Sequence, residues 1–301
     1  MLSKLFFPKK VRAIFTATAY YYNESFKLWS AREVEMGAKL LISQHGGGVG
    51  TALWSQEESH MVESSDLFYS WGWGQSNSKI KNMPASKLAY TKRSVSNRAL
   101  EGDILCVINA DIVNYMHSQY PMPVERHFIE YTNEIAQVYA LLNSKARKSF
   151  RYRLYHTNYN RVAWGVEEKL VDIGLGKIID KKGVDFYSRI SNCKLAVIVY
   201  GQNTTMYETL SANFPTMLFW NPDHWEIRED AKECFSVLEQ AGIYHVSAQS
   251  LCQKINEIHL DIDKWWHSKN TQKAVNLFCS KYATTKENHI EEWAVELKNK
   301  I

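Results

Sequence analysis

The stretch LAVIVYGQNTTMYETLSANFPTMLFW, residues 195–220, contains the pattern that decides the fold. Its continuous apolar run at 195–200 is typical of a strand that is buried on both faces of a parallel sheet. A polar turn, GQNTT, follows at 201–205, and the spacing predicts a helix over 206–212 and a further strand over 215–220. Strand, turn, helix and strand in this order indicate one unit of an open α/β sheet.

The same alternation extends from this stretch toward the N-terminus, in two blocks. In the nearer block we expect strands at 103–109, 152–156 and 177–180, with helices at 123–147, 162–173 and 184–192. In the first block we expect strands at 11–19, 39–43 and 67–70. A polar and basic segment, 76–102, separates the blocks, and we interpret it as a linker with a peripheral strand.

We therefore predict an α/β protein with two Rossmann-like, doubly wound parallel sheets that face each other. The first domain and its linker are expected over residues 1–100, and the second domain over 101–285. A terminal helix is expected over 286–301.

Composition and charge narrow the class of protein. The chain has 301 residues, of which 45% are hydrophobic and 23% charged, and its net charge is +4. This weak, scattered basicity gives no support for nucleic-acid binding, but it allows a loose contact with an acidic membrane surface. The five cysteines are far apart, which gives no support for a disulfide framework or a zinc site. No apolar stretch is long enough to span a bilayer, so we expect a cytoplasmic protein, peripheral at most to the inner face of the membrane.

The turn after the run at 195–200 is the strongest candidate for a phosphate site. Parallel sheets bind ligands at the carboxyl ends of their strands, and a helix start offers unpaired amides to an anion. We expect Gln202, Asn203, Thr204 and Thr205 to bind phosphate. We expect Glu208, one turn further along the helix, to accept hydrogen bonds from ribose hydroxyls. The spacing fits a second interpretation equally well, in which the turn only caps a helix and the carboxylate is solvated.

A second polar segment, Gln44-His45-Gly46-Gly47-Gly48, ends the predicted strand 39–43. Its glycines let the backbone approach a ligand closely. His45 could take a proton from an acceptor hydroxyl, and we predict it as the catalytic base. The run matches neither a dinucleotide fingerprint nor a Walker loop, so it does not specify ATP or NAD.

Other strand ends supply weaker candidates for the same crevice. They are Gln44 after the predicted strand 39–43, His156 and Asn158 at the end of the predicted strand 152–156, and Glu226 and Arg228 after the strand 215–220. For the last two, a surface ion pair is the competing interpretation. Trp71-Gly72-Trp73-Gly74 could form a platform for a sugar or base, but packing between the domains is the simpler interpretation.

Residues 39–74 and 195–228, together with Asp261-Ile262-Asp263 and Trp265-Trp266, resemble the surface-polysaccharide transferases encoded in O-antigen gene clusters. That family resembles GT-B glycosyltransferases, which have two facing Rossmann-like domains with the active site between them. The resemblance implies that Thr204 and Thr205 hold phosphate, that Glu208 holds ribose and that His45 faces the reacting centre. It also implies that no metal or other cofactor is needed, and that a terminal helix, 289–298, crosses back to the first domain.

The resemblance implies a nucleotide sugar as donor and a polysaccharide or lipid-linked glycan as acceptor. A GT-B first domain is longer than the block before residue 76, so we expect the first domain to be incomplete. Two alternatives stay open at this point. One is a nucleotide-sugar 2-epimerase of similar fold, and the other is a non-catalytic subunit that binds sugar nucleotides.

Overall fold

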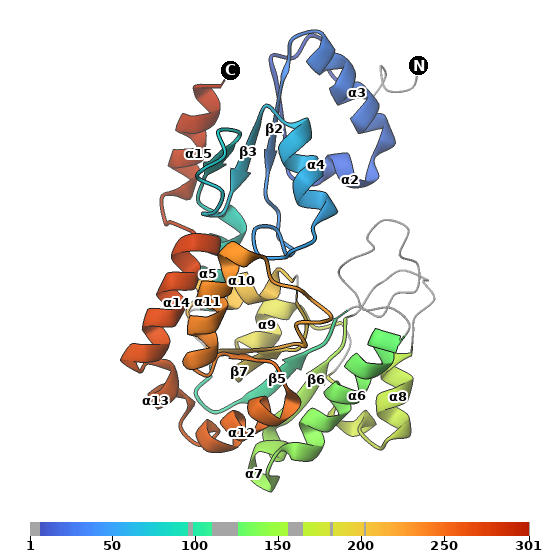
Figure 1. Ribbon diagram of the computed structural model, residues 1–301, viewed down its shortest axis with the longest axis vertical. Coiled ribbons are helices and arrows are strands. Elements are labelled where there is room, and N and C mark those ends of the chain that lie inside the picture. The colour runs from blue at the N-terminus through green and yellow to red at the C-terminus, as the bar shows by residue number, and fades with distance from the viewer. Residues whose placement is uncertain are drawn as a thin grey trace.

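Two parallel β-sheets, stacked along the long axis of the molecule, form the framework of the computed structural model (Figure 1). The structure describes residues 7–95, 99–109, 126–155, 165–180, 183–201 and 203–300. The predicted fold class, an α/β protein with two facing parallel sheets, is confirmed. Among the described residues, no helix has the length and apolar character that crossing a lipid bilayer requires.

The first sheet contains four strands in the order β1-β2-β3-β4. Their bounds are β1 Ala13–Thr16, β2 Lys39–Ser43, β3 Leu67–Ser70 and β4 Ile80–Asn82. Three helices connect them, namely α2 Ala19–Tyr22, α3 Glu24–Glu35 and α4 Gln56–Ser64. Asn23 and Ser55 cap α3 and α4, because their side-chain oxygens accept the amide protons of Phe26 and Glu58.

The second sheet contains five strands in the order β6-β5-β7-β8-β9. Their bounds are β5 Asp103–Val107, β6 Phe150–Arg153, β7 Cys193–Ile198, β8 Thr216–Phe219 and β9 Tyr244–His245. A single parallel bridge joins Ile179 to Tyr152 on the outer side of β6. If the bridge is counted as a short strand, the sheet has the strand order of a Rossmann sheet. In this order the chain adds strands on one side of β5 first and then on the other side, beginning with β7. Ligands of such sheets bind where the order reverses, outside the carboxyl ends of these two strands.

The strand β7 shows why this region of sequence decides the fold. Five of its six residues are buried, as expected for the central strand of a sheet covered by helices on both faces. The helices of this half are α6 Arg126–Leu141, α7 Ser144–Ser149, α8 Val166–Asp172, α9 Phe186–Ile190, α10 Thr205–Ser211, α11 Glu229–Gln240, α12 Ala248–Ile258, α13 Ile262–Trp266 and α14 Lys269–Tyr282.

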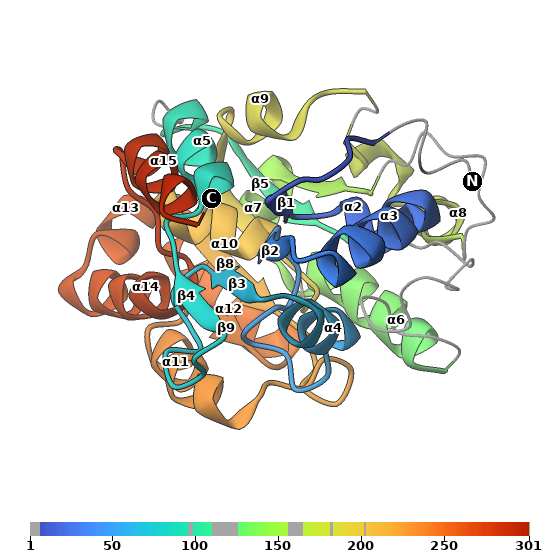
Figure 2. The ribbon, with the colours of Figure 1, turned by 90° about the horizontal axis from the view of Figure 1, so that it is seen from above.

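The last helix, α15 (His289–Lys298), returns to the first sheet (Figures 1 and 2). Its Trp293 and Leu297 pack against Leu41 and Tyr69, on the face of the sheet opposite to α3 and α4. The Trp293 indole donates a hydrogen bond of 2.8 Å to the Pro84 carbonyl. The buried carboxylate of Glu296, on the same helix, accepts a hydrogen bond from the Tyr69 hydroxyl and pairs with Lys81. The C-terminal segment therefore belongs to the core of the first half.

Three predicted elements differ from the structure. The segment 76–102, interpreted as a linker with a peripheral strand, contains the edge strand β4 but also a helix, α5 (Ser86–Ser94), that was not expected. The long helix predicted over 123–147 is two helices, α6 and α7, because Asn143 stops the first and caps the second. The strand predicted at 177–180 is a 3₁₀ turn, η1 (Gly176–Ile178), followed by the single bridge at Ile179.

The two halves share one hydrophobic core where they meet. Trp71, from the loop after β3, lies edge-on to Tyr207 of α10, with ring centroids 5.9 Å apart. The Tyr207 hydroxyl lies 2.7 Å from the Thr51 hydroxyl, which extends the contact to the loop after β2. Trp71 and Trp73 are both buried. Of the two interpretations of the Trp71–Gly74 segment, packing between the halves is the one that the structure supports.

Candidate functional site

The loop after β2 and the turn after β7 touch each other directly at the junction of the two halves. The Gly47 amide donates a hydrogen bond of 3.0 Å to the Thr204 hydroxyl oxygen. At Gly46, whose φ is +142°, a Cβ atom would lie only 2.1 Å from the same oxygen. A side chain at position 46 would therefore separate the two loops, which gives a physical reason for a glycine there.

The turn itself is held by its own side chains. The Asn203 side chain accepts the amide proton of Met206 and donates to the Tyr200 carbonyl, both at 2.6 Å. Asn203 therefore caps the first turn of α10, as the competing interpretation of the sequence proposed. The Thr205 hydroxyl bonds with the Tyr200 phenol. The Thr204 hydroxyl accepts one proton and still has its own to donate. Phosphate binding by these three residues stays a prediction.

His45 precedes the two contacting glycines and is half-buried. Burial lowers its pKa to about 4, with a further contribution from the positive charge of Lys87. The imidazole is therefore neutral at pH 7, which is the protonation state that a general base needs. Its role as the catalytic base stays a prediction.

We expect Lys87→Met to raise the pKa of His45. The ammonium group disfavours the imidazolium ion, so its removal favours protonation, while burial still keeps the pKa below the ordinary value of about 6.5. An NMR titration of the His45 ring in both proteins measures the shift. Lys92→Met, a substitution at the other end of the same helix, serves as the control. A His45 pKa that is unchanged or lower in Lys87→Met would contradict the electrostatic coupling.

Glu208, the predicted ribose ligand, is buried at the junction of α5, α9 and α10. The Tyr187 hydroxyl donates a hydrogen bond of 2.9 Å to its carboxylate, and the Lys87 ammonium lies 3.5 Å from it. Burial and then the Glu208 charge raise the pKa of Tyr187 to about 12, so the phenol stays protonated and donates. The carboxylate is thus buried and paired rather than solvated, and ribose binding stays a prediction.

A second connection between the halves lies beside this junction. Ala52 and Ile227 form an antiparallel bridge, and the Arg228 amide donates to the Thr51 carbonyl at 3.0 Å. The Arg228 guanidinium pairs with Glu58 at 2.8 Å. The carboxylate of Glu226 accepts the indole proton of Trp54 at 2.7 Å. In this structure Glu226 and Arg228 therefore bind the first half, and any contact with a ligand stays a prediction.

Gln44 lies behind the glycine loop rather than on its surface. Its side-chain carbonyl accepts the Trp71 amide at 3.0 Å and the Trp73 indole at 2.8 Å, and its NH₂ group donates to the Val49 carbonyl. These bonds hold the loops after β2 and β3 together. The side chain thus has a structural role, and contact with a ligand stays a prediction.

Three predicted site residues, Gln202, His156 and Asn158, lie outside the described part of the chain. Two residues of the site were not predicted, namely Lys87 and Tyr187. Lys87 falls in the segment interpreted as a linker, and Tyr187 falls in the helix predicted over 184–192, to which no site residue was assigned. The spacing of Leu88, Ala89 and Thr91, which are buried on one side of α5, is the sequence signal that could have predicted this helix. Lys87 lies in its first turn.

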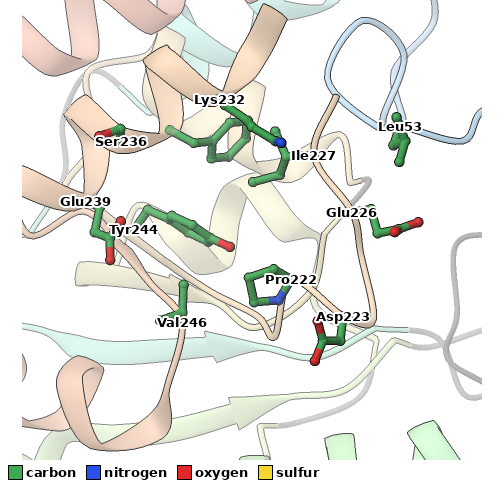
Figure 3. A pocket seen from close by; sticks show the side chains of 11 residues that line it. Leu53, Pro222, Asp223, Glu226, Ile227, Lys232, Ser236, Glu239, Tyr244 and Val246 are labelled. Atoms are coloured by element: carbon green, nitrogen blue, oxygen red, sulfur yellow. The ribbon is translucent and has the colours of Figure 1, made fainter. Parts of the chain in front are cut away.

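A cavity of about 420 Å³ opens next to this second connection, at the carboxyl ends of β8 and β9 (Figure 3). Its apolar lining includes Pro222, Phe235 and Tyr244, and Leu53 enters from the loop of the first half. Its charged lining comprises three carboxylates and one ammonium, from Asp223, Glu226, Glu239 and Lys232. Such a lining suits a neutral group with hydroxyls better than a phosphate.

Comparison with sequence models of protein families assigns the chain to a family. The sequence model of the LIC12162 family transferase matches residues 2–297. The chain belongs to this family. As a LIC12162 family transferase it catalyses group transfer, so the expectation of a transferase is confirmed at this level. No curated protein matches the chain.

Solved structures share the fold at low sequence identity. MnaA from S. aureus, in a co-structure with UDP, superposes with a TM-score of 0.56 and 10% identity over 100% of this chain and 80% of that one. A candidate UDP-N-acetylglucosamine 2-epimerase from Listeria monocytogenes superposes with a TM-score of 0.53 and 12% identity, over 97% of this chain and 78% of that one. WaaG, a glycosyltransferase involved in lipopolysaccharide biosynthesis, superposes with a TM-score of 0.39 and 11% identity, over 95% of this chain and 74% of that one. This similarity is too low to support an argument. The first two confirm the two-sheet, GT-B-like fold.

Proposed function

We propose that this LIC12162 family transferase is a glycosyltransferase that moves a sugar from a nucleotide sugar to a glycan acceptor. The observation that carries the proposal is the contact of Gly46 and Gly47 with Thr204. It brings His45 of the first half to the turn that follows β7 of the second half. That turn lies where the sheet order reverses, which is the place where Rossmann sheets bind nucleotides.

In the proposed reaction, an acceptor hydroxyl attacks the anomeric carbon as the bond from that carbon to the phosphate oxygen breaks. The phosphate leaves with the bonding electrons, and His45 takes the hydroxyl proton. Asn203, Thr204 and Thr205, together with the predicted ligand Gln202, stabilise the leaving phosphate. The positive charge of Lys87, whose side chain is 46% exposed, favours the same anion. The step as proposed uses no bound metal or other cofactor.

Glu208 is the proposed partner of the ribose hydroxyls. The cavity beside Tyr244 would hold a neutral, hydroxyl-bearing part of the donor or acceptor. The nucleotide in the MnaA co-structure makes UDP the first donor nucleotide to test. The acceptor in this proposal is a surface polysaccharide or its lipid-linked precursor, as in O-antigen synthesis. The epimerase alternative is not favoured, because the family is one of transferases.

Thr204→Val combined with Thr205→Val is expected to weaken nucleotide binding by ~10-fold or more, since a hydrogen bond to a charged group contributes about 1.5–3 kcal/mol. Isothermal titration with UDP and UDP-sugars measures the change. Thr204→Ser keeps the hydroxyl and should bind normally. Thr209→Val, one turn along α10, removes a hydroxyl whose bonds within the described residues go to carbonyls of its own helix, and it serves as the control. Unchanged affinity in the double variant would remove the phosphate site.

The reaction class has its own test. Nucleotides and nucleotide sugars are first screened for those that raise the melting temperature, because a ligand of the folded state stabilises it. A stabilising donor is then incubated with and without lipid-linked glycan acceptors. Transfer to an acceptor supports the proposal. An epimerised donor formed without any acceptor, or binding without turnover on any acceptor, would overturn it in favour of the epimerase or of the non-catalytic subunit.

A further inference from the structure

Three side chains of types that can bind metal ions meet outside the proposed transfer site, where α6 approaches the segment after β8. They are His127 and Glu130, which lie on the same side of α6, and His224. One potential ligand atom from each residue lies within 4.8 Å of the other two. The group is a two-histidine, one-carboxylate set, which is a common ligand set for zinc and related divalent metals.

The spacing within the group is close to that of a metal site. The His224 Nε2 atom lies 3.3 Å from Oε2 of Glu130. A tetrahedral zinc ion with bonds of ~2.0–2.1 Å holds its ligand atoms about 3.3 Å apart. His127 is exposed, and its ring stacks on that of His224 with centroids 4.9 Å apart. One ligand atom of His127 already lies within 4.8 Å of those of the other two residues.

Only one ring nitrogen of the buried His224 side chain has a hydrogen-bond partner among the described residues, namely Nε2, which bonds with Glu130. The His224 side chain is 1% exposed, and its Nδ1 atom has no hydrogen-bond partner in the part of the chain that the structure describes. The ring nitrogen that approaches Glu130 is Nε2, so a bound ion would take the place of that hydrogen bond. The other carboxylate oxygen of Glu130, Oε1, accepts the Arg126 Nε–H at 2.7 Å, which orients Oε2 toward the imidazole.

We propose that His127, Glu130 and His224 bind a divalent transition metal ion, with zinc as the best fit. The ion would tie the start of α6 to the segment that carries Trp225, Glu226 and Arg228 to the first half. Trp225 packs against Gly201, where a Cβ atom would lie 2.5 Å from the Cβ of Trp225. The metal therefore steadies the segment beneath the turn at 201–205. It takes no part in the proposed transfer step, so the two proposals stand or fall separately.

The experiment uses the untagged full chain, freed of metal with a chelator and titrated with ZnCl₂ by calorimetry. We expect one zinc ion per chain. His127→Ala and Glu130→Gln should each weaken binding by at least ~10-fold, because even an outer-shell partner of a metal site typically contributes ~10–100-fold in affinity. Both positions are on the surface side of the group, so these variants keep the fold even where His224→Ala does not.

His267→Ala is the matched control, because His267 lies 4.0 Å from the Asp263 carboxylate but belongs to no group of three such ligands among the described residues. Its zinc affinity should equal that of the wild type. Bound Co²⁺ gives a second readout, since its visible absorption should be lost in His127→Ala. The proposal is overturned if the wild type binds no zinc, or if His127→Ala and Glu130→Gln bind it as tightly as the control does.

Discussion

His45→Ala is expected to lower turnover by at least ~100-fold while nucleotide affinity stays close to that of the wild type, because general-base catalysis contributes ~10²–10⁴ in rate. The side chain lies at the end of β2, in the first half, whereas the proposed nucleotide site lies in the second half. Steady-state kinetics and calorimetric titration of the nucleotide separate the two effects. Turnover near the wild-type rate would exclude His45 as the base.

The control for this variant is His60→Ala, which removes an exposed imidazole from α4 of the same half. The pH profile adds an independent check. The pKa of His45 is about 4 in the protein without ligand, so the base is already deprotonated above about pH 5. The value of kcat/KM should therefore fall only as the pH approaches 4. A fall in kcat/KM centred near pH 6.5 that is absent in His45→Ala would contradict the lowered pKa.

Gly46→Ala is expected to destabilise the fold by about 2–6 kcal/mol, from a strained backbone at ~1–3 kcal/mol and steric overlap at ~1–3 kcal/mol. The new methyl group would meet Thr204 with its nearest atom at 2.1 Å, so the two loops must separate. Transfer should fall with stability, because the same contact brings His45 to the turn after β7. Urea unfolding and the transfer assay measure both effects.

Gly47→Ala provides the matched comparison within the same loop. Its φ is also positive, at +72°, but the nearest atom to an added Cβ is a Glu57 carboxylate oxygen at 3.9 Å. Only the backbone penalty applies there, roughly 1–2 kcal/mol. Combining Gly46→Ala with Thr204→Ala should recover part of the lost stability, since it removes the overlapping hydroxyl and methyl groups. Equal destabilisation by the two glycine variants would show that the close contact has no energetic importance.

Several features of the site could be predicted from local sequence. The apolar run that ends at Tyr200 and the strand that ends at Ser43 predict that the polar residues after them lie at the carboxyl edges of two sheets. The glycines after His45 predict that the backbone of this loop closely approaches a neighbouring group, which we expected to be a ligand. In the structure, the group that these glycines approach is a residue of the protein, Thr204.

Other features depended on which elements pack together. Basic and polar residues dominate the segment around Lys87, so it was interpreted as a linker, although Leu88 and Ala89 bury one face of α5. Glu208 has the same local pattern whether it is solvated or buried. Only the packing of α5 and α9 against α10 places Lys87 and Tyr187 beside it. Likewise, nothing near Arg228 in the sequence indicates that its partner is Glu58, 170 residues away.

By itself, the sequence determined the alternation of strands and helices, the two parallel sheets and the strand ends that carry polar residues. These follow from hydrophobic periodicity and from turn chemistry, which act over a few residues. The tertiary structure decided which loops touch, which charges pair and that α15 packs on the first sheet. The physical reason is that periodicity specifies which face of an element is buried but not which surface covers it. That choice depends on how side chains far apart in the sequence fill the space between the sheets.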